Sequence, residues 1–254
     1  MRGIEIERYA AELARVTLWI GDLQWLKKNG YLPDRRPILD SLDQIEERDA
    51  LLDRSKGAEP KDWPEAEWPE TDVIIGNPPF LGDRRMIAQL GETYVSRVRS
   101  IFDGRVPGRS DFVTYWFAKG LDALSHGRAI RCGLVATNSI SGGNNLPVLE
   151  RITHHSRIAD AWDDEKWVID GAAVRVALVC FGSDFVGLPA LDGEPVEAIT
   201  AGLRSDSITP SAAALTENGA VAFIGDQKNG PFDIEGAVAR AWLQAPANAN
   251  GNHN

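Results

Sequence analysis

The strongest helical pattern of apolar positions lies near the start of the chain. Apolar residues recur there at three- and four-residue spacing, which predicts a helix over residues 9–28. A very short apolar piece, residues 1–6, precedes this helix, and a further apolar piece, residues 45–52, follows a Pro-rich connection. We interpret these two pieces as strands of a sheet, with Glu5 and Asp49 at their tips.

A continuous apolar run, Val73 to Ile75, predicts a strand that is covered on both faces, as in a parallel sheet. The run stops abruptly at Gly76, which permits close approach of another segment, and at two prolines that cannot continue a ladder of hydrogen bonds. In open α/β sheets, ligands bind just beyond the carboxyl ends of strands. We therefore expect residues 77–80, Asn-Pro-Pro-Phe, to face a ligand.

The pattern beyond Phe80 alternates between helices and one strand. Asp111 is the expected N-cap of an amphipathic helix, whose aromatic side chains we assign to the core. Pro147 suits the first turn of a later helix. The predicted helices cover residues 84–90, 92–102, 112–124 and 147–156, the predicted strand covers residues 129–136, and polar loops cover residues 103–110 and 137–145.

The last strongly apolar segments predict a closing pair of antiparallel strands, residues 158–162 and 172–181. Trp167 falls in the predicted loop between them. From Gly182 onward the apolar pattern thins. We expect a turn at residues 191–193, weak strands near residue 198 and at 220–224, a helix over 234–243 and a disordered end from residue 245.

Charge narrows the range of functions. The 254 residues carry a net charge of −10, which argues against a protein that binds nucleic acid over its whole surface. Residues 84–109 nevertheless hold six arginines against Glu92 and Asp103, a local charge of +4. The six are Arg84, Arg85, Arg97, Arg99, Arg105 and Arg109. This segment is either a solvated face or a loop that contacts phosphates, and Arg84, Arg85, Arg105 and Arg109 are the candidate phosphate contacts.

Cysteine and histidine usage adds little chemistry. Cys132 and Cys180 lie far apart in apolar runs, which indicates reduced thiols in a cytoplasmic protein. The four histidines show no metal-ligand spacing, and no apolar run is long enough to span a bilayer. We expect neither a metal site nor a membrane partner.

The Asn-Pro-Pro-Phe stretch suits one chemistry well. The exocyclic amine of adenine is a poor nucleophile, because its lone pair is delocalised into the ring. The Asn77 side-chain oxygen and the Pro78 carbonyl could accept its two N–H bonds and let the nitrogen attack a sulfonium methyl group in line. Phe80 supplies a face on which a flipped base can stack. An ordinary Pro-Pro turn, and methylation of a glutamine side-chain amide by the same clamp, stay open as alternatives.

The residues 77–80 resemble the fourth conserved motif of amino-group methyltransferases, above all those that act on N6 of adenine in DNA. With its flanks, the chain resembles the methyltransferase domain of MmeI-like combined restriction–modification enzymes. The similar stretches are residues 3–20, 48–52, 75–82, 108–117, 133–139 and 167–181, with 230–234 and 239–240 similar to the entrance of the target-recognition region.

The resemblance implies a Rossmann-like class I methyltransferase sheet, mostly parallel with a terminal antiparallel hairpin. It implies S-adenosylmethionine as methyl donor and adenine in duplex DNA as acceptor. Glu5, followed by Ile6, matches the acid that binds the cofactor ribose, and Asp49 matches the acceptor for the cofactor adenine. Residues 77–80 match the target-base clamp, and Trp167 is the candidate that stacks on the flipped base.

The chain also departs from the family pattern. Such enzymes carry a Gly-rich cofactor loop after a first strand, and neither is present in this sequence, which begins at the expected second strand. We therefore interpret the chain as an internal fragment, with a partial catalytic domain at 1–184 and the start of the target-recognition region at 185–254. Another chain would supply the missing loop. The alternative function is a catalytically inactive remnant or a DNA-binding accessory piece.

Overall fold

The computed structural model of the protein describes residues 1–31, 44–169, 172–205 and 235–244. The chain forms two compact units, Met1–Ser207 and Ile208–Asn254. In the second unit the described element is helix α6 (Gly236–Leu243), which agrees with the helix predicted at its end. None of the helices in the described ranges is long and apolar enough to cross a membrane.

The chain begins with a β–α–β piece, as predicted. Its elements are β1 (Gly3–Glu5), α1 (Arg8–Lys28) and β2 (Ile45–Glu47). β1 and β2 pair in parallel and form a two-stranded sheet of their own. The strand predicted over residues 45–52 is shorter in the structure, because the Asp49 carboxylate accepts hydrogen bonds from the amides of Leu51 and Leu52 and turns the chain there.

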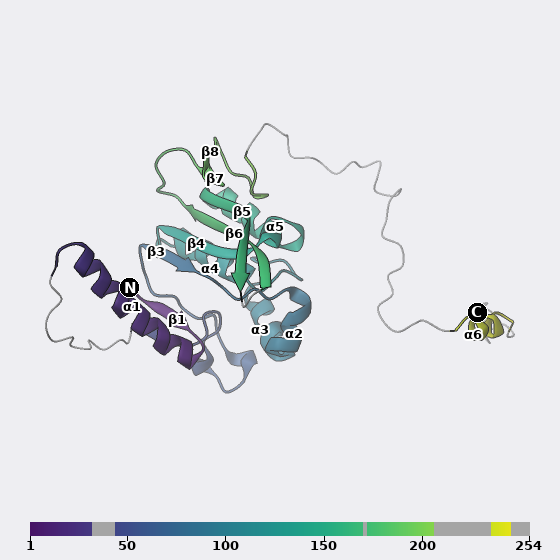
Figure 1. Ribbon diagram of the computed structural model, residues 1–254. Helices are drawn as coiled ribbons and strands as arrows, with labels where there is room; N and C mark the ends of the chain where they lie inside the picture. Colours follow the sequence, from purple (N-terminus) through teal and green to yellow (C-terminus); the bar gives the residue numbers. More distant parts are fainter. Residues whose placement is uncertain (32–43, 170–171, 206–234, 245–254) are drawn as a thin grey trace. The chain divides into compact units, whose positions relative to one another are not determined.

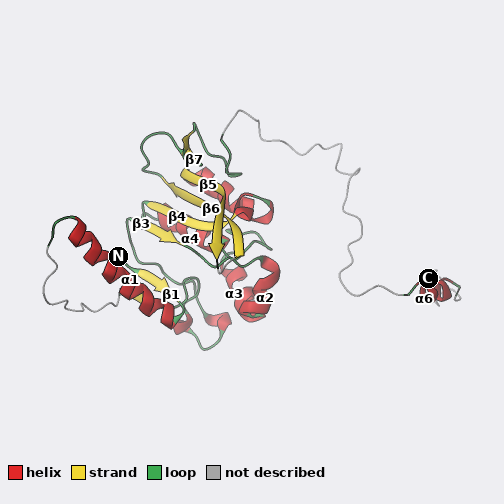
Figure 2. Cartoon of the chain, viewed as in Figure 1, coloured by secondary structure: helices red, strands yellow, loops and turns green. Residues whose placement is uncertain are grey.

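The remaining strands form one six-stranded sheet, in the order β3-β4-β6-β5-β7-β8 (Figure 2). The strands are β3 (Val73–Gly76), β4 (Arg131–Thr137), β5 (Arg157–Ile169), β6 (Ala172–Gly182), β7 (Ala190–Leu191) and β8 (Glu194–Pro195). β3, β4, β5 and β7 run in one direction, whereas β6 and β8 run in the other. The fold is therefore mixed α/β with mostly parallel strands and an antiparallel hairpin.

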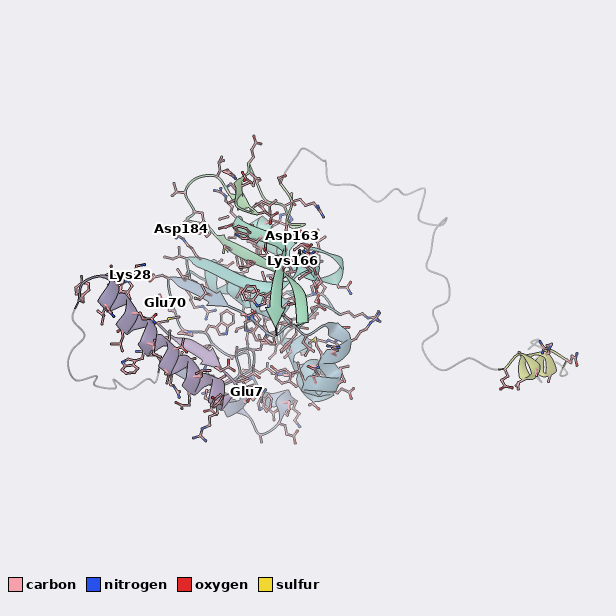
Figure 3. All side chains as sticks on the ribbon, in the orientation of Figure 1. Glu7, Lys28, Glu70, Asp163, Lys166 and Asp184 are labelled. Atoms are coloured by element: carbon pink, nitrogen blue, oxygen red, sulfur yellow. The ribbon has the colours of Figure 1, made fainter. Side chains whose placement is uncertain are left out.

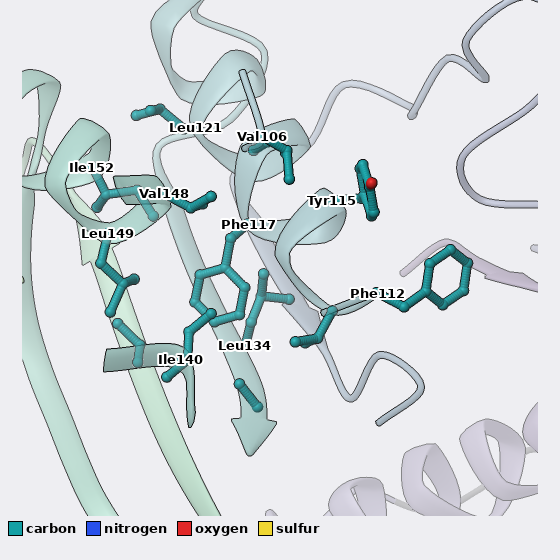
Figure 4. Packing of buried hydrophobic residues seen from close by; sticks show 14 of the residues in the cluster. Val106, Phe112, Tyr115, Phe117, Leu121, Leu134, Ile140, Val148, Leu149 and Ile152 are labelled. Atoms are coloured by element: carbon teal, nitrogen blue, oxygen red, sulfur yellow. The ribbon is translucent and has the colours of Figure 1, made fainter. Parts of the chain in front are cut away.

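Four helices belong to this sheet: α2 (Asp83–Leu90), α3 (Glu92–Ile101), α4 (Thr114–Ser125) and α5 (Leu146–His155). α4 packs on β4, α5 packs on β5, and the two helices contact each other. Their buried side chains meet those of the strands in one hydrophobic cluster (Figure 4). Phe117 of α4 stacks on Phe181 of β6, with ring centroids 6.1 Å apart. The aromatic residues of α4 thus belong to the core, as predicted.

β3 differs from its prediction. The sequence predicts a strand covered on both faces, but in the structure β3 is the edge strand of the six-stranded sheet. The side chains of Val73 and Ile75 are 50% and 69% exposed, whereas Ile74 packs against the core cluster. Within the described residues, β3 pairs with β4 alone, so one face and one edge of this apolar strand are uncovered.

The closing hairpin is longer than predicted. β5 continues to Ile169 through the charged residues 163–166, because Glu165 and Lys166 pair with β6 and a register shift accommodates Asp163 and Asp164. The placement of Trp167 in a loop is therefore wrong, since Trp167 pairs with Val174 inside the hairpin.

The sheet also continues beyond the hairpin. The predicted turn at residues 191–193 connects β7 and β8, and Ile199 and Leu203 are buried in the main cluster. The expected domain boundary after residue 184 thus falls inside the first compact unit. The strand predicted at 220–224 and the tail from residue 245 lie outside the described residues.

Candidate active site

The Asn-Pro-Pro-Phe loop follows β3 directly and is anchored by buried residues within and just after it. Asn77 and Pro79 are exposed, Phe80 is half-buried, and the Pro78 ring is buried. Leu81 is buried in the core cluster, and its carbonyl accepts a hydrogen bond of 2.8 Å from the amide of Phe112. The loop therefore presents Asn77 to solvent from a fixed base.

The two acceptors that the sequence singles out are free in the described part of the chain. The Asn77 carboxamide makes no hydrogen bond there, and no donor from the described residues reaches the Pro78 carbonyl, whereas the Pro79 carbonyl accepts from the amide of Leu81 at 3.1 Å. Two unpartnered acceptors on consecutive residues suit a ligand that offers two N–H donors, such as an exocyclic amine.

Sequence reasoning missed a polar cluster beside this loop. Asp111, predicted as an N-cap, does not cap α4, because its carboxylate is bound elsewhere. Oδ1 accepts from the Asp83 amide at 3.2 Å, and Oδ2 accepts from Ser139 Oγ and Asn145 Nδ2, both at 2.8 Å. Ser139 and Asn145 lie in the loop after β4, 28 and 34 residues along the chain, so local spacing carried no signal of these contacts.

Glu5 lies where the prediction placed it, at the carboxyl end of β1. Its Oε1 accepts a hydrogen bond of 2.9 Å from the Glu7 amide, which leaves Oε2 without a partner in the described residues. The Glu5 carbonyl accepts from the amide of Arg48, so the structure brings Glu5 and the segment that carries Asp49 together at one end of the β1–β2 pair. Ile6, which follows, is exposed.

Asp49 is buried, and both of its carboxylate oxygens are engaged. Oδ1 accepts from the Leu51 and Leu52 amides, and Oδ2 accepts from Arg54 Nε at 3.0 Å and Nη2 at 2.7 Å. The Arg54 guanidinium also lies 5.3 Å from the ring centroids of Trp63 and Tyr94. Burial, and then the negative charge of Asp49, raise the pKa of Tyr94 above its ordinary value. A ligand amine could reach Oδ2 of Asp49 only by displacing Arg54.

Of the four candidate phosphate contacts, Arg105 has a different role. Its guanidinium donates to Glu65 and to Asp122, at 2.6 Å in each case. Lys119, buried on α4, donates to the other oxygen of Glu65 at 2.9 Å. Burial alone would raise the pKa of Glu65, but hydrogen bonds from Arg105 and Lys119 bring it below the ordinary value. Arg105 therefore belongs to an internal ion network, which a count of charges in the sequence cannot reveal.

The other three arginines are available. Arg84 and Arg85 lie on the first turn of α2, directly after the Asn-Pro-Pro-Phe loop, and both are exposed. Arg109 is exposed in the loop before α4, with a left-handed backbone (φ 64°). None of the three side chains forms an ion pair with a described residue. Trp167 is 41% exposed on the β5–β6 hairpin. Figure 3 labels Asp163 and Lys166 on the same hairpin. No group of three or more potential metal ligands occurs among the described residues.

A mixed α/β domain with an open Asn-Pro-Pro-Phe loop at a strand tip has the architecture of a methyltransferase domain. The chain belongs to the family described as "MmeI, DNA-methyltransferase domain", which matches residues 1–186. It is 30% identical over 191 residues to DNA methyltransferase A of Bacillus subtilis (strain 168), across 71% of this chain and 20% of that protein.

A solved structure is also similar, that of the type IIL restriction–modification enzyme MmeI in complex with DNA. It shares 26% sequence identity and superposes with a TM-score of 0.59, over 82% of this chain and 29% of the MmeI chain. The chain thus spans less than a third of the length of either relative.

Proposed function

We propose that this domain transfers a methyl group from S-adenosylmethionine to N6 of an adenine flipped out of duplex DNA. The observation that carries the proposal is the pair of unpartnered acceptors, Asn77 and the Pro78 carbonyl, at the carboxyl end of β3. They would accept the two amine N–H bonds, localise the nitrogen lone pair and aim it at the methyl group. Phe80, half-buried beside them, offers its face to the flipped base.

Glu5 fits the cofactor in its present conformation. The unpartnered Oε2 could accept hydrogen bonds from ribose hydroxyls at the end of β1, with Ile6 as an apolar wall beside the sugar. S-adenosylmethionine supplies an electrophilic methyl group when bound. Asp49 fits only in part, because Arg54 occupies the oxygen that would accept from the cofactor adenine. We expect cofactor binding to exchange the Arg54 contact for the adenine amine.

A further strand would complete the sheet. The strand order expected in this class of methyltransferase is 3-2-1-4-5-7-6. The pair β2-β1 corresponds to strands 3 and 2 of that order, and β3-β4-β6-β5 corresponds to strands 4, 5, 7 and 6. The place of strand 1, between β1 and β3, is open in the described residues. An apolar edge strand with exposed Val73 and Ile75 is a strong template for pairing. We propose that a parallel strand from polypeptide outside the described residues pairs there and brings the Gly-rich loop that holds the methionine end of the cofactor.

Exposed arginines and one tryptophan supply the proposed contacts to DNA. Arg84, Arg85 and Arg109 are charged and exposed, which suits phosphate binding. Arg84 and Arg85 follow the Asn-Pro-Pro-Phe loop directly, and Arg109 lies two residues before Asp111, which contacts Asp83. Trp167 would stack on the flipped base from the hairpin. Arg105 is left out, because Glu65 and Asp122 already neutralise it.

The second candidate function is a catalytically inactive remnant or a DNA-binding accessory piece. The open place beside β3 in the described residues, where the strand that leads into the cofactor loop is expected, favours this reading for the chain by itself.

Radiolabelled methyl transfer to unmethylated DNA separates the two functions. The full chain is assayed alone and with an added polypeptide that carries a parallel strand followed by a Gly-rich loop. We expect transfer in the combined sample and a loss of at least about 100-fold in Asn77→Ala, the scale seen when one preorganised polar group is removed from a reacting centre. Gln89→Ala, which removes an exposed carboxamide from α2, is the matched control and should keep the transfer rate. Transfer that survives Asn77→Ala would remove Asn77 from the reaction.

A further inference from the structure

The loops that follow β3 and β4 leave the same edge of the sheet. β3 and β4 are parallel neighbours, with Gly76 opposite Leu134, so the Asn-Pro-Pro-Phe loop and the loop over residues 138–145 emerge side by side. Leu81 and Ile140, one from each segment, are buried in the core cluster and anchor the loops from the inside. Polar side chains connect the two loops nearer the surface.

Asp111 joins the two loops through one carboxylate. Oδ1 accepts from the Asp83 amide, three residues after Phe80, and the neighbouring Phe112 amide donates to the Leu81 carbonyl. Residues 111 and 112 therefore bind the chain at two points just after the target-base loop, residues 77–80.

The second carboxylate oxygen of Asp111 reaches the loop after β4. Oδ2 accepts from Ser139 Oγ and from Asn145 Nδ2. Asn145 is 5% exposed, and its Oδ1 accepts in return from the Asp111 amide at 2.8 Å. Its Nδ2 also donates to the Ser139 carbonyl at 3.1 Å, so every polar atom of this buried amide is used. A buried amide satisfied in this way has one orientation, which makes the connection rigid.

We propose that Asp111 is a positioning residue that fixes the position of the Asn-Pro-Pro-Phe loop relative to the loop after β4. This inference rests on the proposed function, because the position of Asn77 matters only if Asn77 grips the acceptor. A misplacement of about 1 Å in a reacting group can cost about 100-fold in rate. Asp111 itself touches no reacting atom.

Two variants and one control isolate this role. Asp111→Asn keeps an acceptor for the Asp83 amide but sets an amide donor against Asn145 Nδ2, which can only donate and whose orientation is fixed by the bond from the Asp111 amide to Asn145 Oδ1. The Ser139 hydroxyl can rotate to accept. Ser139→Ala is milder and lies on an exposed residue, so it remains informative should Asp111→Asn fail to fold. The control is Ser110→Ala, which removes a buried hydrogen bond of 2.7 Å to the Asn144 carbonyl, in the same loop, but touches nothing in the target-base loop.

Hydrogen exchange on the full chain tests the connection without any catalysis. Asp111→Asn loses the bond to Asn145, which frees residue 111 to move, so we expect the peptides that contain the amides of residues 83 and 111 to exchange at least about tenfold faster. Ser139→Ala should raise exchange to a lesser degree, and Ser110→Ala should leave it unchanged. Unchanged exchange in both variants, with folding retained, would overturn the proposal.

The functional half is measured with the polypeptide that completes the sheet and DNA carrying 2-aminopurine at the target base. We expect Asp111→Asn to lower kcat about 10- to 100-fold, leave KM for DNA nearly unchanged and reduce the fluorescence gain of base flipping, whereas Ser110→Ala keeps all three. Faster exchange with an unaltered kcat and flipping signal would overturn positioning. An unsubstituted protein that transfers no methyl group would instead refute the proposed function, and the exchange data would still decide whether Asp111 holds the loop.

Discussion

The helices α1 and α4 both have apolar residues at helical spacing, but α4 buries them and α1 leaves most of them exposed. α4 places eight of its residues in the core, among them Tyr115, Phe117 and Leu121. α1 is almost twice as long but buries only Ala11, although it also carries apolar residues at helical spacing. The exposed apolar residues of α1 include Tyr9, Leu13, Val16, Ile20 and Trp25. Figure 1 shows α1 lying beside β1.

The difference lies in what each helix meets. α4 packs on β4 of the six-stranded sheet and against α5, whereas α1 contacts the two short strands β1 and β2. An amphipathic stripe predicts a helix in both cases, but the burial of that stripe depends on a partner. α1 and the exposed face of β3 therefore carry sequence suited to a cover that the described residues do not provide.

The largest expected effect is in the core. Phe117→Ala should lower the free energy of unfolding by about 3–5 kcal/mol, because Phe117 is fully buried against Phe181 and its removal leaves a cavity. Urea unfolding measures this change. A loss below about 1 kcal/mol would mean that α4 is no better packed than α1, and the comparison would fail.

An intermediate effect concerns the ion network around Glu65. Its pKa is lowered in the folded state, so its contribution to stability is present above the ordinary value near 4.5 and is lost as pH falls through the lowered folded value. We expect the unfolding free energy to fall as the pH is lowered below about 4.5, and to fall less steeply in Glu65→Gln. Glu70→Gln is the control for global charge, because the Glu70 side chain is exposed and forms no hydrogen bond or ion pair with a described residue. If the unfolding free energy changed with pH equally steeply in Glu65→Gln and in the unsubstituted protein, the ion network around Glu65 would not contribute to stability as described.

The smallest expected effect is in α1. Leu13→Ala should change the unfolding free energy of the chain alone by less than about 0.5 kcal/mol, because the Leu13 side chain is 55% exposed. The comparison sharpens when the completing polypeptide is added, since the same substitution should then weaken its binding measurably in calorimetry. Binding that is indifferent to Leu13→Ala and to Ile20→Ala would show that the stripe is not covered by that partner.

The sequence predicted the elements that local pattern controls. The helical spacing of α1 and α4, the strand β4 and the abrupt stop of β3 at Gly76 all lie where expected. The family and its DNA methyltransferase character also followed from short stretches read together, and the match over residues 1–186 confirms them.

Features that depend on distant partners were missed. β5 extends through a charged run with poor strand propensity, because pairing with β6 outweighs local preference. Asp111 is not an N-cap, since Asn145 and Ser139 offer its carboxylate better partners. The engagement of Arg105 by Glu65, 40 residues away, could not be read from a cluster of arginines. In each case the deciding contact is remote in sequence, so spacing holds no trace of it.

The central claim is that Asn77 and the Pro78 carbonyl grip the exocyclic amine of adenine at the tip of β3. It is tested most directly by identifying the methylated base, through nucleoside digestion and mass spectrometry of DNA treated with the completed protein and S-adenosylmethionine. The account predicts N6-methyladenine as the product, absent with Asn77→Ala. A methyl group on carbon 5 of cytosine, where no amine is attacked, would contradict it.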